Sequence, residues 1–101
     1  MTIQVTIPSA LITGSSRGIG RGIAIKLAEC GVPRIGVHYL KQKDEAEQTA
    51  RLVEQRGARA VLIQADVTKP EDIGRMFAEA RTAIGPLGAF VANARPDVEL
   101  F

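Results

Sequence analysis

Three glycines and a basic residue share a short turn near the start of the chain. Residues 13–20 read Thr-Gly-Ser-Ser-Arg-Gly-Ile-Gly, directly after the apolar residues 10–12 and at the head of an amphipathic run. Glycine at such positions lets a phosphate-bearing ligand approach the main chain where a Cβ would stand. The N–H groups of the first helical turn, with the positive end of the helix dipole, then bind a diphosphate. The predicted contact residues in this turn are Gly14, Ser16, Arg17, Gly18, Ile19 and Gly20.

The spacing of these glycines distinguishes the turn from other phosphate-binding loops. It reads G-x-x-x-G-x-G, one residue longer at the front than the standard dinucleotide fingerprint. No Gly-Lys-Ser/Thr follows, so it is not a P-loop. Glycine, serine and arginine also form ordinary loops, so the context must decide.

Four short apolar runs alternate with three segments of helical period. The runs cover residues 10–13, 35–39, 60–64 and 88–92, and Ile7 extends the first one backwards past Pro8 in one alternative. Most are near-continuous rather than alternating, which is typical of strands covered on both faces. The order βαβαβαβ predicts an α/β domain with a parallel sheet and right-handed crossovers.

The intervening segments carry apolar faces and stop signals of helices. The first face includes Ile19 and Ala24 and ends at Gly31, and the second segment spans residues 44–56. The third carries Ile73, Phe77, Ala80 and Ile84 and ends at Gly85-Pro86. Thr68 is its candidate hydroxyl cap and Pro70 its early proline. The glycine turn therefore lies between a first strand and a first helix, as a phosphate site requires.

The loop after the second strand bears on the cofactor. NAD-binding domains often place an acidic residue there to bond the ribose 2′-hydroxyl. This chain has Tyr39-Leu40-Lys41 instead. The missing acid, with Arg17 and Lys41 nearby, favours NADP over NAD, and NAD stays the alternative. Lys41 can also be read as part of a solvated helix start.

Two further loops contribute candidate contacts. After the third strand, the Asp66 carboxylate can accept a hydrogen bond from an adenine amino group, while the Val67 amide pairs with a ring nitrogen. Helix capping is the alternative for Asp66, although Thr68 is better placed to cap. After the fourth strand, Asn93 can satisfy main-chain groups where strands diverge, and Ala94 lets a ribose pass close by.

These four loops together resemble the short-chain dehydrogenase/reductase family, in its subgroup with T-G-x-x-x-G-x-G, over residues 8–95. Thr13, Gly14, Gly18 and Gly20 fit the family's phosphate turn, Asp66-Val67 its adenine contact, and Asn93-Ala94 the middle of its Asn-Asn-Ala-Gly segment. The resemblance implies a Rossmann-type doubly wound parallel sheet, truncated to about four strands and three helices. It also implies hydride transfer between NAD(P)H and a carbonyl or alcohol substrate, with 3-oxoacyl groups among the candidates.

The chain departs from the family pattern in two ways. Arg95 replaces the glycine of the fourth-loop segment. The family's catalytic Tyr-x-x-x-Lys pair and its serine belong to segments after the fourth strand, so we expect no catalytic residue in this chain. Tyr39 and Lys43 have the right spacing but lie beside the adenosine ribose, without a serine partner. The chain is thus expected to be the amino-terminal cofactor-binding part of a longer reductase, inactive by itself.

Size and composition agree with one small domain spanning residues 1–101. The net charge is +2 with interspersed signs, which predicts neither a nucleic-acid nor a membrane partner. Cys30 is the only cysteine, so neither an internal disulfide nor a Cys/His metal site is expected. Without a leader or a long apolar run, the expected location is the cytoplasm.

The Rossmann strand order makes the fourth strand an apolar edge, with Phe90 and Val91 partly bare. Further sequence or a partner chain, such as a second copy in a homo-oligomer, would cover it.

Two alternative functions stay open at this point. One is a dinucleotide-binding module without catalysis, which would bind NADPH without turnover. The other is a degenerate remnant that binds nothing and persists by pairing the edge of its fourth strand with another chain.

Overall fold

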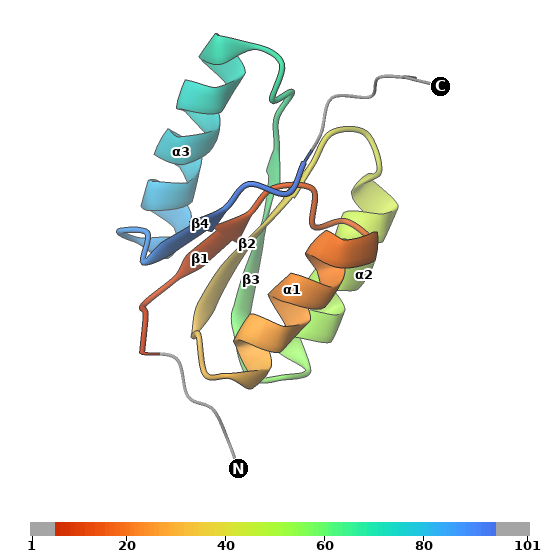
Figure 1. Cartoon of the computed structure of the whole chain (residues 1–101), viewed down its shortest axis with the longest axis vertical. Helices are drawn as coiled ribbons and strands as arrows, with labels where there is room; N and C mark the ends of the chain where they lie inside the picture. The colour runs from red at the N-terminus through yellow and green to blue at the C-terminus, as the bar shows by residue number, and fades with distance from the viewer. Residues whose placement is uncertain (1–5, 95–101) are drawn as a thin grey trace.

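The computed structural model describes residues 6–94, in which strands and helices alternate as predicted (Figure 1). The elements are β1 (Ala10–Ile12), α1 (Gly18–Glu29), β2 (Arg34–Tyr39), α2 (Lys43–Glu54), β3 (Arg59–Gln64), α3 (Pro70–Ile84) and β4 (Ala89–Val91). The predicted α/β class is confirmed. Strand bounds agree with the sequence prediction to within one or two residues.

The four strands form one parallel sheet in the order β3-β2-β1-β4. In the register, Ile12 lies opposite Val37 on one side and Val91 on the other. Helices α1 and α2 cover one face and α3 covers the other, so the sheet is doubly wound (Figure 1). The carboxyl ends of all four strands therefore meet at one end of the domain, where a ligand crevice is expected in this architecture.

The core is divided by the sheet because alternate strand residues face opposite sides. Ala10 and Ile12 pack with the small residues of α1 and with α2, whereas Leu11 packs with α3. All three side chains of β1 are completely buried. The glycine turn therefore follows directly from a fully buried strand inside the sheet.

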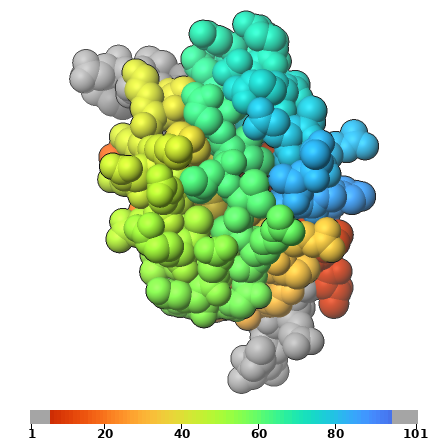
Figure 2. All heavy atoms as spheres, turned by 180° about the vertical axis from the view of Figure 1, so that it is seen from behind, coloured from red at the N-terminus to blue at the C-terminus, as the bar shows by residue number. Residues whose placement is uncertain are grey.

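Both edge strands reach the surface. Figure 2, seen from behind, shows β3 in green between α2 in yellow-green and α3 in blue-green. At the other edge, β4 exposes 43% of Phe90, whose ring packs against Phe77 with centroids 4.9 Å apart. The prediction that β4 is a partly bare apolar edge is confirmed for Phe90, while Val91 is half-buried.

Two details of the first strand and helix differ from the sequence prediction. Ile19 does not join the core face of α1, because the helix contacts the sheet through Ala24 and Ala28 and its first turn leaves Ile19 78% exposed. The extension of β1 back to Ile7 is also wrong. The strand starts at Ala10, after Pro8, which has no N–H to donate to a ladder.

The start of α3 differs as well. Pro70 occupies its first turn as predicted, but the capping residue is Lys69, and no side chain caps the helix. Thr68 is not a cap, because its hydroxyl donates to the Asp66 carboxylate at 2.5 Å. The two candidate capping side chains thus bind each other instead of the helix.

Candidate functional site

The glycine turn has some amides that are bonded within the protein and others that are not. Gly14 N donates to His38 Nδ1 at 2.8 Å, and Ser15 N donates to the His38 carbonyl at 3.1 Å. The amides of residues 16–20 have no acceptor among residues 6–94. Gly14, a predicted contact residue, therefore has no free amide, and the available N–H groups begin at residue 16. They lie at the N-terminus of α1, where unbonded amides and the positive end of the helix dipole favour an anion.

The three glycines of this turn are required for different reasons. A Cβ on Gly14 would lie 2.9 Å from Ala94 Cα, and one on Gly20 would lie 2.2 Å from Gly14 O. These two glycines allow close backbone packing within the protein, a role that sequence reasoning missed. Gly18 differs, since a Cβ there would meet nothing within 4 Å and its φ is +62°. Gly18 is thus the one that faces open space.

Ser16 is fixed through its main chain. Its carbonyl accepts hydrogen bonds from Arg21 Nη2 at 2.7 Å and from Thr49 Oγ1 at 2.9 Å, while Arg21 Nε donates to Thr49 Oγ1 at 2.8 Å. The Ser15 hydroxyl is also used internally, since it donates to Ile12 O and accepts from His38 N. Of the two serine hydroxyls in this turn, that of Ser16 has no bonded partner among residues 6–94.

Arg17 and Lys41, the two cations proposed to recognise a 2′-phosphate, are both exposed. Arg17 Nε lies 3.7 Å from Glu45 Oε2, on the first turn of α2. That carboxylate oxygen is inaccessible to solvent and accepts no hydrogen bond from the residues described. The sequence reasoning missed Glu45, which places an acid beside Arg17 although none follows β2 directly.

Asp66 and Val67 form the third loop, and both are half-buried. Asp66 Oδ1 accepts from the backbone N of Thr68 at 2.9 Å as well as from its hydroxyl. These Thr68 hydrogen bonds, with smaller contributions from Lys69 and Lys41, lower the pKa of Asp66. Asp66 Oδ2 and the Val67 amide have no partner within residues 6–94. One acceptor and one donor are therefore available side by side.

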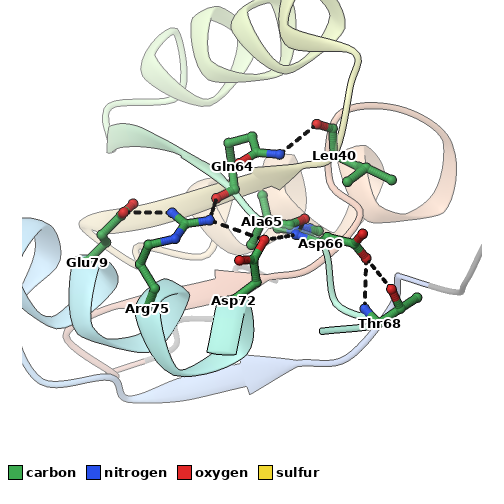
Figure 3. A network of polar contacts seen from close by, with 9 residues as sticks. Leu40, Gln64, Ala65, Asp66, Thr68, Asp72, Arg75 and Glu79 are labelled. Carbon is green, nitrogen blue, oxygen red and sulfur yellow. Dashed lines mark hydrogen bonds and ion pairs between the residues drawn. The ribbon is translucent and has the colours of Figure 1, made fainter. Parts of the chain in front are cut away.

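A polar network behind Asp66 holds this loop to α3 (Figure 3). Asp66 N donates to Asp72 Oδ2 at 2.9 Å, and Arg75 pairs with Asp72 at 3.4 Å. Arg75 Nη2 also donates to Gln64 O at 2.9 Å, at the end of β3. The side chain of Gln64 then donates to Leu40 O at 3.0 Å. This chain of contacts ties the third loop to the second.

The fourth loop is bonded to the first. Asn93 Nδ2 donates to Gly14 O at 3.1 Å, and the backbone amides of Asn93 and Ala94 both donate to Thr13 Oγ1, at 2.9 and 3.0 Å. The prediction that Asn93 satisfies main-chain groups where strands diverge is confirmed. Arg95 and Pro96 lie outside the described residues.

Tyr39 is the last residue of β2, half-buried against the core, and its carbonyl accepts from Ala65 N at 3.1 Å. Lys43 is the first residue of α2. Their spacing matches a catalytic pair, but one ends a strand and the other starts the following helix. This placement fits a structural role for Tyr39 at the edge of the site.

His38 is the principal residue that sequence reasoning missed. The residue is 2% exposed, and its ring bonds both Gly14 N and, through Nε2 at 2.9 Å, Ala65 O. Desolvation lowers its pKa, and the Ala65 contact opposes this in part. The available signal was a histidine within the apolar run of residues 35–39. Arg21 carried no comparable signal, because its side-chain partner Thr49 lies 28 residues away on another helix.

Neither a membrane-spanning helix nor a metal-binding cluster is found in residues 6–94. No helix there is long and apolar enough to cross a bilayer. No group of three or more His, Cys, Asp or Glu side chains there could hold a metal ion.

A doubly wound parallel sheet, with its loops gathered at the carboxyl ends of the strands, defines the Rossmann-like class of α/β domains. The sequence model of the short chain dehydrogenase family matches residues 8–96. Because this match covers most of the chain, the protein belongs to that family.

Individual relatives agree with this assignment. The chain is 41% identical over 86 residues to a 3-oxoacyl-[acyl-carrier-protein] reductase of Staphylococcus epidermidis, covering 85% of this chain and 35% of that protein. A dehydrogenase/reductase structure from Sinorhizobium meliloti superimposes with a TM-score of 0.85 at 35% identity, covering 92% of this chain and 36% of that one. The angucycline C-6 ketoreductase LanV, solved with bound NADP, gives a TM-score of 0.75 at 36% identity, covering 85% and 35%. The chain thus spans about a third of the length of the proteins that it matches.

Proposed function

We propose that residues 1–101 form a single NADP(H)-binding domain of a short-chain dehydrogenase/reductase-type oxidoreductase. The cofactor, when bound, supplies or accepts a hydride, and the substrate of the whole protein is a small carbonyl compound or alcohol. The observation that carries this proposal is the row of unbonded amides at residues 16–20, which lies at a helix N-terminus next to the open space at Gly18.

The remaining contacts follow from the loops around this turn. Asp66 Oδ2 accepts from the adenine amino group and the Val67 amide donates to a ring nitrogen. Asn93 and Ala94 border the nicotinamide ribose, and Tyr39 borders the adenosine ribose. The proposed cofactor-binding residues are Gly14, Ser16, Arg17, Gly18, Ile19, Gly20, Tyr39, Lys41, Asp66, Val67, Asn93 and Ala94.

NADP is the preferred cofactor in this proposal and NAD the alternative. Arg17 and Lys41 supply two cations for a 2′-phosphate, and arginine offers a bidentate contact to it. The NADP-bound ketoreductase structure supports the same preference by similarity. Glu45 acts against it, because its carboxylate competes for Arg17.

The substrate class rests on similarity alone. The Staphylococcus epidermidis relative is named as a 3-oxoacyl reductase, which makes a 3-oxoacyl group one candidate. The residues that transfer protons to the substrate are proposed to lie outside this chain. Action in the cytoplasm and assembly into a homo-oligomer are further parts of the proposal.

Titration of NADPH and NADH fluorescence tests the cofactor assignment. Arg17→Ala and Lys41→Ala should each weaken NADPH binding about tenfold, since a charge-assisted hydrogen bond contributes roughly 1.5–3 kcal/mol, and should leave NADH binding unchanged. Arg51→Ala removes an exposed cation from the last turn of α2 and serves as the control. Equal losses for both cofactors would contradict the NADP preference.

A further inference from the structure

The imidazole of His38, near the end of β2, connects two loops of the site. Nδ1 accepts from Gly14 N, at the start of the glycine turn, and Nε2 contacts Ala65 O, the residue before Asp66. A carbonyl can only accept, so the ring carries its proton on Nε2 and is neutral. The backbone of His38 adds hydrogen bonds to Ser15 in both directions.

The two ring contacts join parts of the site that bind different ends of a dinucleotide. Gly14 starts the turn whose amides receive the diphosphate, and Ala65 precedes the carboxylate that receives adenine. With φ at +68° and Ala94 packed closely against it, Gly14 has little freedom to find another acceptor. An N–H group that loses its partner away from water is destabilising. Without Nδ1, the turn must therefore shift or leave this amide unbonded.

We propose that His38 is a positioning residue for dinucleotide binding: its Nδ1 aims the amides of residues 16–20, while its Nε2 holds the adenine loop at a fixed distance from them. This proposal rests on the proposed function, because both loops are assigned there to NADP(H). His38 itself does not touch the cofactor, and the ring is too deeply buried to do so.

Two isosteric replacements separate the two ring contacts. The Oδ1 atom of asparagine can take the place of Nδ1, so His38→Asn keeps an acceptor for Gly14 and loses the Ala65 contact. The Nε2 atom of glutamine can take the place of the ring Nε2, so His38→Gln keeps the Ala65 contact and loses the Gly14 acceptor. Each variant loses one buried hydrogen bond, so we expect similar losses of thermal stability.

The full chain and its variants are titrated with NADPH under conditions where circular dichroism shows them folded. His38→Asn should bind within about threefold of the unmodified chain, and His38→Gln should bind about tenfold more weakly. Ser9→Ala is the control for stability alone. It removes a fully buried hydroxyl that donates to Pro86 O at 2.7 Å, at the opposite end of β1. This control should lose stability and keep its affinity.

Equal affinities of the asparagine and glutamine variants, or an equal loss in Ser9→Ala, would overturn the positioning role. Absence of NADPH binding by the unmodified chain would instead contradict the proposed function, and the inference with it. Amide hydrogen exchange provides a readout that does not need the cofactor. The Gly14 amide should exchange faster in His38→Gln than in His38→Asn, and equal protection of this amide in both variants would contradict the inference.

Discussion

The carboxylate of Glu45 lies 3.7 Å from the guanidinium of Arg17, at the point where the glycine turn meets α2. One oxygen of this carboxylate is shielded from water and accepts no hydrogen bond among residues 6–94. Its negative charge holds the cation that we assign to the 2′-phosphate. Binding of NADPH must therefore draw Arg17 away from Glu45 or bring a phosphate close to an acid.

Removal of the Glu45 charge should strengthen NADPH binding. In Glu45→Gln, Arg17 is released and the repulsion of the 2′-phosphate is lost, so we expect affinity for NADPH to rise about threefold to tenfold with that for NADH unchanged. Glu54→Gln makes the same charge change at the far end of α2 and should alter neither affinity. If both variants gained the same affinity for NADPH, the effect would come from net charge, and a specific role of the contact between Glu45 and Arg17 would be contradicted.

Two nearby glycines of α1 should respond in opposite ways to alanine. A Cβ at Gly20 would lie 2.2 Å from Gly14 O, so Gly20→Ala must displace the turn and should lower the free energy of unfolding by about 1–3 kcal/mol or more. A Cβ at Gly22 would meet nothing within 4 Å, and Gly22→Ala should stabilise the helix by about 0.5–1 kcal/mol. Urea unfolding of both variants measures the difference, and equal effects would contradict this account of the close packing.

The hydroxyl of Thr13 should be important for the stability of the fourth loop. It accepts hydrogen bonds from the amides of both Asn93 and Ala94. Valine has nearly the same shape as threonine but no hydroxyl, so Thr13→Val leaves these two N–H groups unbonded. We expect the free energy of unfolding to fall by about 2 kcal/mol, as measured by urea titration. Thr13→Ser keeps the hydroxyl and should lose clearly less. Similar losses in the two variants would show that the methyl group, and not the hydroxyl, is what matters.

Stability should fall on mild acidification because of His38. Burial lowers its pKa below the ordinary 6.5, so the unfolded chain binds more protons than the folded one between these two values. The contribution of His38 to the free energy of unfolding should be constant well above pH 6.5. It should decrease as the pH falls through 6.5, with a slope of at most about 1.4 kcal/mol per pH unit, until the folded-state pKa is passed. Gly14 and Ala65, which the ring bonds, carry no charge, and the neighbouring Asp66 carboxylate is bonded to Thr68.

Urea unfolding at several pH values between about 7.5 and 5 measures this dependence. The variant His38→Asn cannot titrate and should lose most of it. Asp66 does not interfere, because its pKa is lowered from 3.8 and its contribution is lost only at more acidic pH. An unchanged pH dependence in His38→Asn would contradict a neutral buried ring.

The sheet and the glycine turn could be predicted because their signals are local. Four apolar runs, separated by helical periods and glycine stops, determine the order of the elements, and a parallel βαβ topology then brings the ends of the strands together. The same topology predicts that Asn93 lies where two strands diverge. The side-chain contacts of the site could not be predicted in this way, because they depend on the register of the sheet. The hydrogen bond between Gly14 and His38, for example, joins residues that are 24 apart in the sequence.

Two errors have the same origin. Ile19 fits the apolar period of α1, but the tertiary packing of Ala24 and Ala28 leaves its side chain in solvent. Thr68 fits a capping pattern, but the competing Asp66 carboxylate is nearer to its hydroxyl. In both cases the local pattern is correct and a neighbour in space overrides it.

The most direct test of the account compares two glycines with positive φ. Gly18 and Gly57 have φ of +62° and +92°, and a Cβ at either would meet nothing within 4 Å. Valine should therefore cause comparable backbone strain at both sites. Only Gly18→Val places side-chain atoms over the unbonded amides. In titrations of folded protein, NADPH binding should disappear in Gly18→Val and persist in Gly57→Val; undiminished binding by Gly18→Val would contradict a diphosphate site at this turn.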